Sequence, residues 1–189
     1  MQIDNFLNIL MENIIFFIIG LLLILIFLAS ISIIHMRTIR DDINIRWYNL
    51  VEKLQYRQDL VPNLIETLRS YMPEKEITNH AKLINNTIDI RARATRNSNP
   101  GASKVVVEHD LSRHILQLMN MGAKYNEVGR STNYLELKKD FADLNKKIEA
   151  RTNKYNERVR IHNEQLARPY NYIPAKLMRY GKKYIFEFE

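Results

Sequence analysis

Few residues in this chain have the types and spacing that chemistry requires. His109, Asp110 and His114 lie within one and a half helical turns, and Asp110 and His114 are four residues apart, as two metal ligands on one helix face would be. A third ligand is not recognisable, and the H-E-x-x-H arrangement is absent. Asp41 and Asp42 are adjacent and face different directions, which suits acid–base catalysis poorly. We therefore expect no catalytic residue, no metal site and no cofactor.

Other catalytic signatures are missing as well. The chain has no cysteine, which excludes thiolate catalysis, disulfides and cysteine-based zinc sites. It has no P-loop, no glycine-rich nucleotide turn and no G-x-S-x-G motif. The sequence thus predicts a protein that is not an enzyme.

Two groups of polar residues lie within long helical patterns. Arg57 and Asp59 are near the middle of a heptad-like apolar stripe, beside Pro62. We interpret Arg57 as half of a buried ion pair across a helical bundle, with Glu149 as the candidate partner, because such a pair fixes helix register. Asn63 is expected to satisfy backbone groups that Pro62 frees.

The second polar group is Tyr155-Asn156 together with Asn163, which recur at helical spacing. A hydrogen-bonded layer between helices is the preferred interpretation. The alternative is a recognition site on the bundle surface, formed by Arg57, Asp59, Glu66, Asn156 and Asn163.

These polar residues follow a membrane anchor. Residues 14–34 form an uncharged run of 21 residues that would span about 31 Å as a helix, close to the thickness of a bilayer's hydrocarbon core. The preceding segment is acidic and the run is too long for a signal peptide, so we predict an uncleaved transmembrane helix. The predicted domains are a short N-terminal segment (1–13), the transmembrane helix (14–34), a helical bundle (35–168) and an aromatic and basic C-terminal strap (169–189).

The charge distribution bears on orientation and on partners. Arg37, Arg40 and Arg46 follow the apolar run and no basic residue precedes it, so the positive-inside rule predicts a cytoplasmic bundle; the opposite orientation stays open. The formal net charge is +7, and residues 1–34 contain two acidic residues and no basic one. The remaining chain is therefore strongly basic, which favours anionic lipid surfaces or nucleic acid without selecting either.

After the anchor the sequence predicts an all-α fold: one transmembrane helix followed by an elongated antiparallel bundle of about four long helices. The expected helices cover residues 36–72, 74–97, 103–128 and 134–167, with heptad-like stripes typical of a coiled coil. Pro62 predicts a break or a kink in the first of them. The tail from Pro169 has two interpretations that both stay open: a strap over the bundle, made with Tyr170, Tyr172, Leu177 and Phe186, or an interfacial segment that returns to the membrane.

Three stretches together resemble the LemA family. Residues 57–67, RQDLVPNLIET, are similar to its R-x-D-L-[IV]-P-N-L-[VI]-E segment, residues 148–163 to its I-x-x-A-R-x-x-Y-N-x-x-V run, and the tail to its P-x-N ending. Asn126, Asn145 and His162 depart from the family pattern. The resemblance implies a bacterial single-pass membrane protein with a long helical bundle and no established enzymatic activity. The motif residues that it singles out, as structural or recognition positions, are Arg57, Asp59, Leu60, Pro62, Asn63, Leu64, Glu66, Arg151, Tyr155, Asn156, Val159 and Asn163.

The functional hypothesis is a scaffold or adaptor at the bacterial inner membrane, acting by protein–protein interaction or self-association. The alternative is a membrane-surface module that binds anionic lipid through basic helix faces. The basic face in question is formed by Lys138, Lys139, Lys146, Lys147 and Arg151. Nucleic acid is the disfavoured partner, since no reading module is recognisable.

Overall fold

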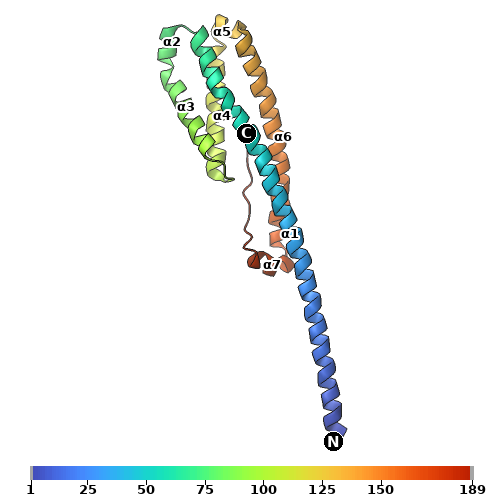
Figure 1. The fold of residues 1–189 in the computed structure, drawn as a ribbon. Helices are drawn as coiled ribbons and strands as arrows, with labels where there is room; N and C mark the ends of the chain where they lie inside the picture. Colours follow the sequence, from blue (N-terminus) through green and yellow to red (C-terminus); the bar gives the residue numbers. More distant parts are fainter. Residues whose placement is uncertain (1, 188–189) are drawn as a thin grey trace. The chain divides into compact units, whose positions relative to one another are not determined.

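The fold is described from a computed structural model, which defines residues 2–187 and their side chains from residue 10 onward. Within residues 2–187 the regular structure is helical throughout, which confirms the all-α prediction (Figure 1). The elements are α1 (Gln2–Tyr71), α2 (Glu74–Asn79), α3 (Ala81–Arg96), α4 (Ala102–Gly122), α5 (Asn126–Arg130), α6 (Thr132–Ala167), the 3-10 helix η1 (Pro169–Asn171) and α7 (Tyr172–Leu177).

The predicted anchor is part of α1, which is one uninterrupted helix. By length and composition this helix can cross a membrane. The large apolar side chains of residues 14–28 are exposed, and Phe16 and Phe17 have 71% and 73% of their surface accessible. Such an exposed apolar run is compatible with a single membrane span.

The chain forms two compact units, and α1 and α6 each contribute to both. The first unit contains the chain up to Asp41 and residues 161–183. The second unit contains residues 42–160 and the tail from Tyr184.

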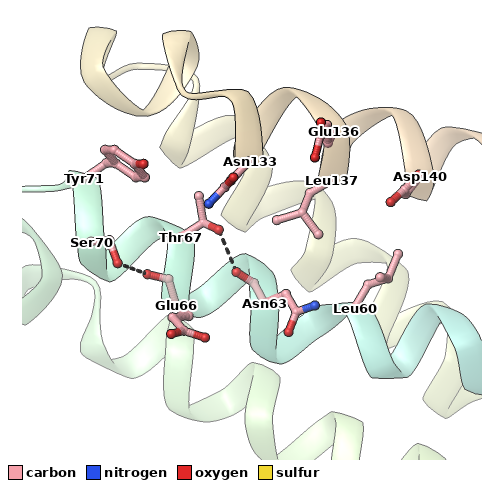
Figure 2. Close-up of a pocket in the computed structure, with 10 residues that line it drawn as sticks. All are labelled: Leu60, Asn63, Glu66, Thr67, Ser70, Tyr71, Asn133, Glu136, Leu137 and Asp140. Atoms are coloured by element: carbon pink, nitrogen blue, oxygen red, sulfur yellow. Dashed lines mark hydrogen bonds between the residues drawn. The ribbon is translucent and has the colours of Figure 1, made fainter.

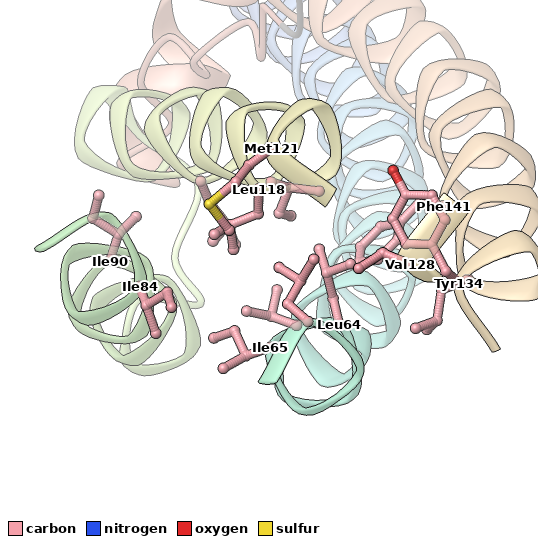
Figure 3. Close-up of a cluster of buried hydrophobic side chains, with 14 of the residues drawn as sticks. Leu64, Ile65, Ile84, Ile90, Leu118, Met121, Val128, Tyr134 and Phe141 are labelled. Carbon is pink, nitrogen blue, oxygen red and sulfur yellow. The ribbon is translucent and has the colours of Figure 1, made fainter. Parts of the chain in front are cut away.

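The second unit is a helical bundle with one apolar core (Figure 3). The core takes residues from α1, α3, α4, α5 and α6, and α3 and α4 pack against each other along their length. The stripe predicted in α1 is confirmed, because every member is buried. Its members are Ile43, Trp47, Leu50, Leu54, Val61, Leu64 and Leu68.

Two predicted helices are shorter than expected. The helix expected over 74–97 is divided at His80 into α2 and α3. In α3, Ile84, Ile90 and Ala94 are buried, whereas Ile88 is 42% exposed. The helix expected over 103–128 ends at Gly122. A Cβ atom at Gly122 would lie 2.7 Å from a methyl group of Leu68 and 3.1 Å from side-chain atoms of Tyr134 and Val128, so a larger residue there would require these side chains to move.

The tail is not a simple strap. In the first unit, Ser32 of α1 donates a hydrogen bond to the side chain of Asn171, which holds η1 against the apolar helix. Tyr170, Tyr172 and Leu177 are more than 60% exposed, so the prediction that they cover the bundle is wrong. In the second unit Phe186 is buried, as predicted.

The prediction of a break at Pro62 is wrong, because α1 continues through it. Proline has no N–H group, so the carbonyl oxygen of Gln58, four residues earlier, loses its helical donor. Arg91 of α3 takes the donor's place: its Nε donates to the Gln58 carbonyl oxygen at 2.7 Å. A side chain from the neighbouring helix, and not Asn63, thus satisfies the carbonyl that Pro62 frees.

This replacement predicts energetic coupling between Pro62 and Arg91. R91A leaves a buried carbonyl without a partner and should lower the free energy of unfolding by about 1–3 kcal/mol. In a P62A background the restored N–H donates to Gln58, so R91A should cost at least about 1 kcal/mol less there. Urea unfolding in an uncharged detergent, monitored by circular dichroism, measures this free energy for the full-length wild type, R91A, P62A and the double variant. Equal costs of R91A in both backgrounds would contradict the assignment.

Candidate functional site

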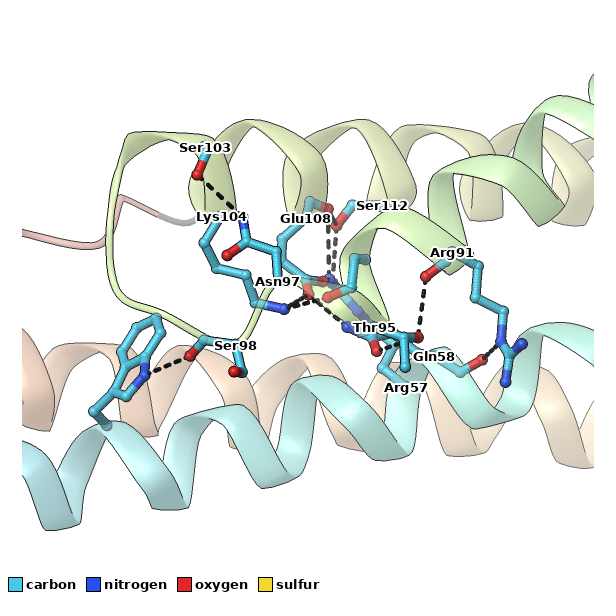
Figure 4. Close-up of polar contacts among 12 residues, drawn as sticks. Arg57, Gln58, Arg91, Thr95, Asn97, Ser98, Ser103, Lys104, Glu108 and Ser112 are labelled. Carbon is cyan, nitrogen blue, oxygen red and sulfur yellow. Dashed lines mark hydrogen bonds and ion pairs between the residues drawn. The ribbon is translucent and has the colours of Figure 1, made fainter.

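A fully buried carboxylate, Glu108 of α4, lies at the centre of a polar network (Figure 4). Its Oε2 accepts a hydrogen bond from Arg57 Nη2 at 2.6 Å. Its Oε1 accepts one from Gln58 Nε2 at 2.6 Å and lies 2.7 Å from Lys104 Nζ. Arg57 Nη1 also donates to Ser112 Oγ at 2.8 Å. One negative charge is therefore held between two positive ones, with short, charge-assisted hydrogen bonds.

The network also reaches α3. Lys104 Nζ donates to the Ala94 carbonyl oxygen at 2.8 Å, and Thr95 Oγ1 donates to Gln58 Oε1 at 3.0 Å. The amide of Gln58 is thereby oriented, with its nitrogen toward Glu108 and its oxygen toward Thr95. Three helices, α1, α3 and α4, are linked by polar contacts that only one register allows.

Burial decides what this network can do. Arg57, Lys104 and Glu108 are each at most 2% exposed. Loss of water lowers the pKa of the Arg57 guanidinium, and the charge and hydrogen bond of Glu108 oppose that shift. A guanidinium still remains protonated at neutral pH. Because the charged groups are withdrawn from solvent, the network holds helices in register and offers no surface to a solute.

The predicted buried ion pair of Arg57 is therefore found, but the predicted partner is wrong. Glu149 is exposed, and Glu108 takes its place. Lys104, Glu108 and Gln58 are the site residues that the sequence analysis missed. The sequence did contain a signal for two of them. Glu108 lies three residues before the buried Leu111, and Lys104 lies four residues before Glu108, so helical spacing places both on the buried face of α4.

The exposed face of the same motif lines an open groove of about 440 Å³ between α1 and α6 (Figure 2). From α1 it is lined by Leu60, Asn63, Glu66, Thr67, Ser70 and Tyr71, and from α6 by Asn133, Glu136, Leu137 and Asp140. Three carboxylates and two amides line it, and no basic residue does. The groove is thus polar and negatively charged, with Leu60 and Leu137 as its apolar part.

The polar groove residues are not used by the bundle itself. Within the part of the chain that the structure describes, the side chains of Asn63, Glu66, Glu136 and Asp140 make no hydrogen bond or ion pair. The hydrogen bonds drawn in Figure 2 run from Thr67 and Ser70 to backbone carbonyls of their own helix. These groove side chains are therefore available to an external ligand or partner.

The remaining residues of this motif have simple environments. Leu64 is fully buried in the core, and Pro62 is exposed on the opposite face. Asp59 is 56% exposed, and its carboxylate lies 3.5 Å from Arg91 Nη2, a surface ion pair of the kind that contributes less than about 1 kcal/mol. This ion pair helps to hold Arg91 beside the Gln58 carbonyl oxygen, where Arg91 replaces the N–H group that Pro62 lacks.

The second motif binds the C-terminal tail, so the prediction of an interhelical layer is wrong. In the second unit the side-chain amide of Asn156 donates to the Phe186 carbonyl oxygen at 2.7 Å and accepts from the Phe186 N–H at 2.8 Å. Tyr155 Oη donates to the Tyr184 carbonyl oxygen at 3.0 Å. Burial raises the pKa of Tyr155 to about 12, which keeps this donor protonated at physiological pH.

Aromatic packing completes this attachment. The rings of Tyr155 and Phe186 lie 5.2 Å and 5.6 Å from that of Trp47, between centroids. Val159 is fully buried one turn further along α6. Arg151 is exposed, as are Lys138, Lys139, Lys146 and Lys147, so the predicted basic face of α6 is accessible.

In the first unit, Asn163 makes the same two-bond contact with Lys183. Its amide donates to the Lys183 carbonyl oxygen at 3.0 Å and accepts from the Lys183 N–H at 2.8 Å. Asn163 therefore holds Lys183 by its backbone alone, as Asn156 holds Phe186 in the second unit.

The histidine group has no metal geometry. His114 Nδ1 contacts the backbone oxygen of Asp110 at 2.8 Å, and the Asp110 carboxylate pairs with Arg113 at 2.7 Å. Among the described residues no group of three or more His, Asp or Glu side chains is placed to hold a metal ion.

Comparison with known proteins agrees with the motifs. The sequence model of the LemA family matches residues 46–189, which is most of the chain. A comparison with curated proteins gave no match.

The network predicts an unequal response to substitution. E108L leaves two buried cations without their carboxylate and should lower the free energy of unfolding by about 3–5 kcal/mol. E149L, at an exposed position of α6, should change it by less than about 0.5 kcal/mol. The triple variant R57M/K104M/E108L removes all three charges and should be more stable than E108L, as measured by urea unfolding of the full chain. If the triple variant is as unstable as E108L, the three charges contribute to the free energy of unfolding and do not only fix the register of the helices.

Proposed function

Since the chain belongs to the LemA family, we propose that it is a membrane-anchored helical scaffold that binds a protein partner at the bacterial inner membrane. The observation that carries the proposal is the groove between α1 and α6. Two of the family-motif positions that line it, Asn63 and Glu66, have exposed side chains that form no hydrogen bond or ion pair with the described residues. Exposed polar residues on a rigid scaffold are the usual material of recognition sites.

The charge of the groove specifies the partner's chemistry. Glu66, Glu136 and Asp140 present negative charge around Leu60 and Leu137. A complementary partner is a protein segment that carries Lys or Arg next to an apolar side chain. Such a segment could belong to another protein or to a second copy of this basic chain. The mass of the complex distinguishes these two partners.

The anchor sets where the partner is met. The apolar part of α1 suits a single membrane span, and the arginines after it support a cytoplasmic bundle. A scaffold of this kind concentrates its partner at the inner membrane and needs no reaction of its own. Its affinity comes from a few contacts in the groove, with steering by charge.

Site-specific crosslinking tests the groove. A photoreactive benzoylphenylalanine replaces Tyr71, which lines the groove, or Tyr48, which is 74% exposed on α1 outside it. In membranes of the native host, we expect a discrete adduct from position 71 and not from position 48. The adduct's mass identifies the partner as a second copy or as another protein.

Charge variants make that test specific. E66Q/E136Q/D140N should reduce the adduct at least about tenfold, which corresponds to about 1.4 kcal/mol. The matched control D143N/E149Q/E157Q removes the same charge from exposed positions of α6 outside the groove and should leave the adduct unchanged. An adduct that survives the groove substitutions, or that falls equally with the control, would refute the proposal.

Orientation is tested separately. The chain has no cysteine, so S98C and K124C introduce single thiols at exposed positions of the second unit. In spheroplasts of the native host, a membrane-impermeant maleimide should label them only after permeabilisation. Labelling of intact spheroplasts would place the bundle outside the cytoplasm and redirect the search to envelope proteins.

A further inference from the structure

A basic cavity of about 270 Å³ lies in the first unit, apart from the groove. Arg40 of α1, His162 of α6 and the loop after α7 line it, and the loop contributes Met178, Arg179, Tyr180, Gly181 and Lys183. Three cationic side chains face this space and no carboxylate lines it. Within the described residues, Arg40, Arg179 and Lys183 form no ion pair, so their positive field is uncompensated.

Two buried polar atoms in the cavity wall have no partner. His162 is 1% exposed, and its Nε2 lies 3.2 Å from the Gly181 carbonyl oxygen, to which it donates. Its Nδ1 is then an acceptor, and among the residues that the structure describes neither this atom nor the buried hydroxyl of Tyr180 has a hydrogen-bond partner. Buried polar atoms are nearly always satisfied by protein, ordered water or a ligand, so these two atoms beside three cations are groups that a bound ligand can engage.

The cavity is built on a fixed loop. The Tyr180 N–H donates to the Ala175 carbonyl oxygen at 2.9 Å, and Arg179 is in the left-handed region with φ 52°, a conformation that helix ends usually assign to glycine. Asn163 holds the backbone of Lys183 at both its N–H and its carbonyl. The guanidinium of Arg40 lies over the Tyr180 ring, 5.2 Å from its centroid.

The position in the chain places this cavity beside the lipid headgroups. Arg40 is six residues beyond Ile34, the end of the apolar run, which is about 9 Å along the helix. The headgroup layer on each side of a bilayer is roughly 5–7 Å deep, and helical side chains lean toward the N-terminus, here toward the membrane.

The neighbouring helix supports the same placement. Tyr172, Ile173 and Leu177 of α7 are exposed, and Ile173 lines an apolar cavity shared with Leu25 and Leu28 of α1. An exposed aromatic and aliphatic segment next to an apolar membrane helix is typical of an interfacial position. The second interpretation of the tail, a return to the membrane, thus fits residues 169–177.

We propose that this cavity binds the phosphate of an anionic lipid headgroup that also carries a hydroxyl group. Arg40, Arg179 and Lys183 neutralise the phosphate, and the Tyr180 hydroxyl donates to one of its oxygens. The Nδ1 of His162 accepts from the headgroup hydroxyl. Burial lowers the pKa of His162. The hydrogen bond to Gly181 opposes this shift, and the positive charges of Lys183 and Arg40 add to it. The ring therefore stays neutral, and its Nδ1 remains a hydrogen-bond acceptor. The proposal does not depend on the groove or its partner.

The test uses the full chain in an uncharged maltoside detergent, with short-chain phosphatidylglycerol as the probe. Native mass spectrometry measures the apparent affinity, with phosphatidylcholine of the same chain length and glycerol phosphate as comparison probes. Phosphatidylglycerol should bind at least tenfold more tightly than either.

Two sets of variants distinguish a site from general attraction. R40Q/R179Q/K183Q should weaken phosphatidylglycerol binding at least tenfold. The matched control R37Q/K176Q/K182Q removes three charges from exposed positions of the same segments outside the cavity and should leave binding within about twofold. Y180F, which removes only the hydroxyl and should fold normally, should weaken binding several-fold.

Three outcomes would overturn the proposal. An equal loss in the two triple variants would show diffuse charge attraction. Equal binding of glycerol phosphate would show a site for a free anion instead of a lipid. Unchanged binding in Y180F, together with a triple cavity variant that retains affinity, would remove the cavity from consideration.

Discussion

The arrangement of the helices in the second unit depends on one buried carboxylate, Glu108, held by Arg57 and Lys104. Apolar stripes alone tolerate sliding by a helical turn, because one leucine replaces another at each contact. A buried charge does not tolerate it, since a slip of α4 against α1 would separate Glu108 from Arg57 and leave the buried guanidinium unpaired, at a cost of about 3–5 kcal/mol. The network therefore selects one register from several that the core would accept.

A single ten-residue stretch of α1 serves three purposes at once. Its inner face supplies Arg57 and Gln58 to the network, and Pro62 frees a carbonyl that draws Arg91 of α3 into contact with α1. Its outer face supplies Asn63 and Glu66 to the groove. Proline is normally excluded from helix interiors because its lost hydrogen bond is not replaced. Here a neighbouring guanidinium replaces it, so the helix remains continuous and gains an attachment to α3.

The asparagines of α6 have a different role from the one that helical spacing suggests. Each forms two hydrogen bonds to one backbone residue of the tail, as a neighbouring strand would. The tail is thereby fixed by contacts that do not read its side chains. This leaves Lys183 in the first unit free to present its ammonium group to the basic cavity. The proposed partner groove belongs to the second unit and the proposed lipid cavity to the first.

The sequence by itself determined the apolar helix that can span a membrane, the all-α class, the buried stripe of α1 and the family, because length, charge and period-3.6 patterning are local properties of the chain. It also indicated that Arg57 needs a buried partner. Only the tertiary structure decided that this partner is Glu108 and not Glu149, that Arg91 compensates for Pro62, and that Asn156 and Asn163 hold the tail. Each of these is a contact between segments far apart in the chain, and local patterning shows that a polar group must be satisfied without showing which distant group satisfies it.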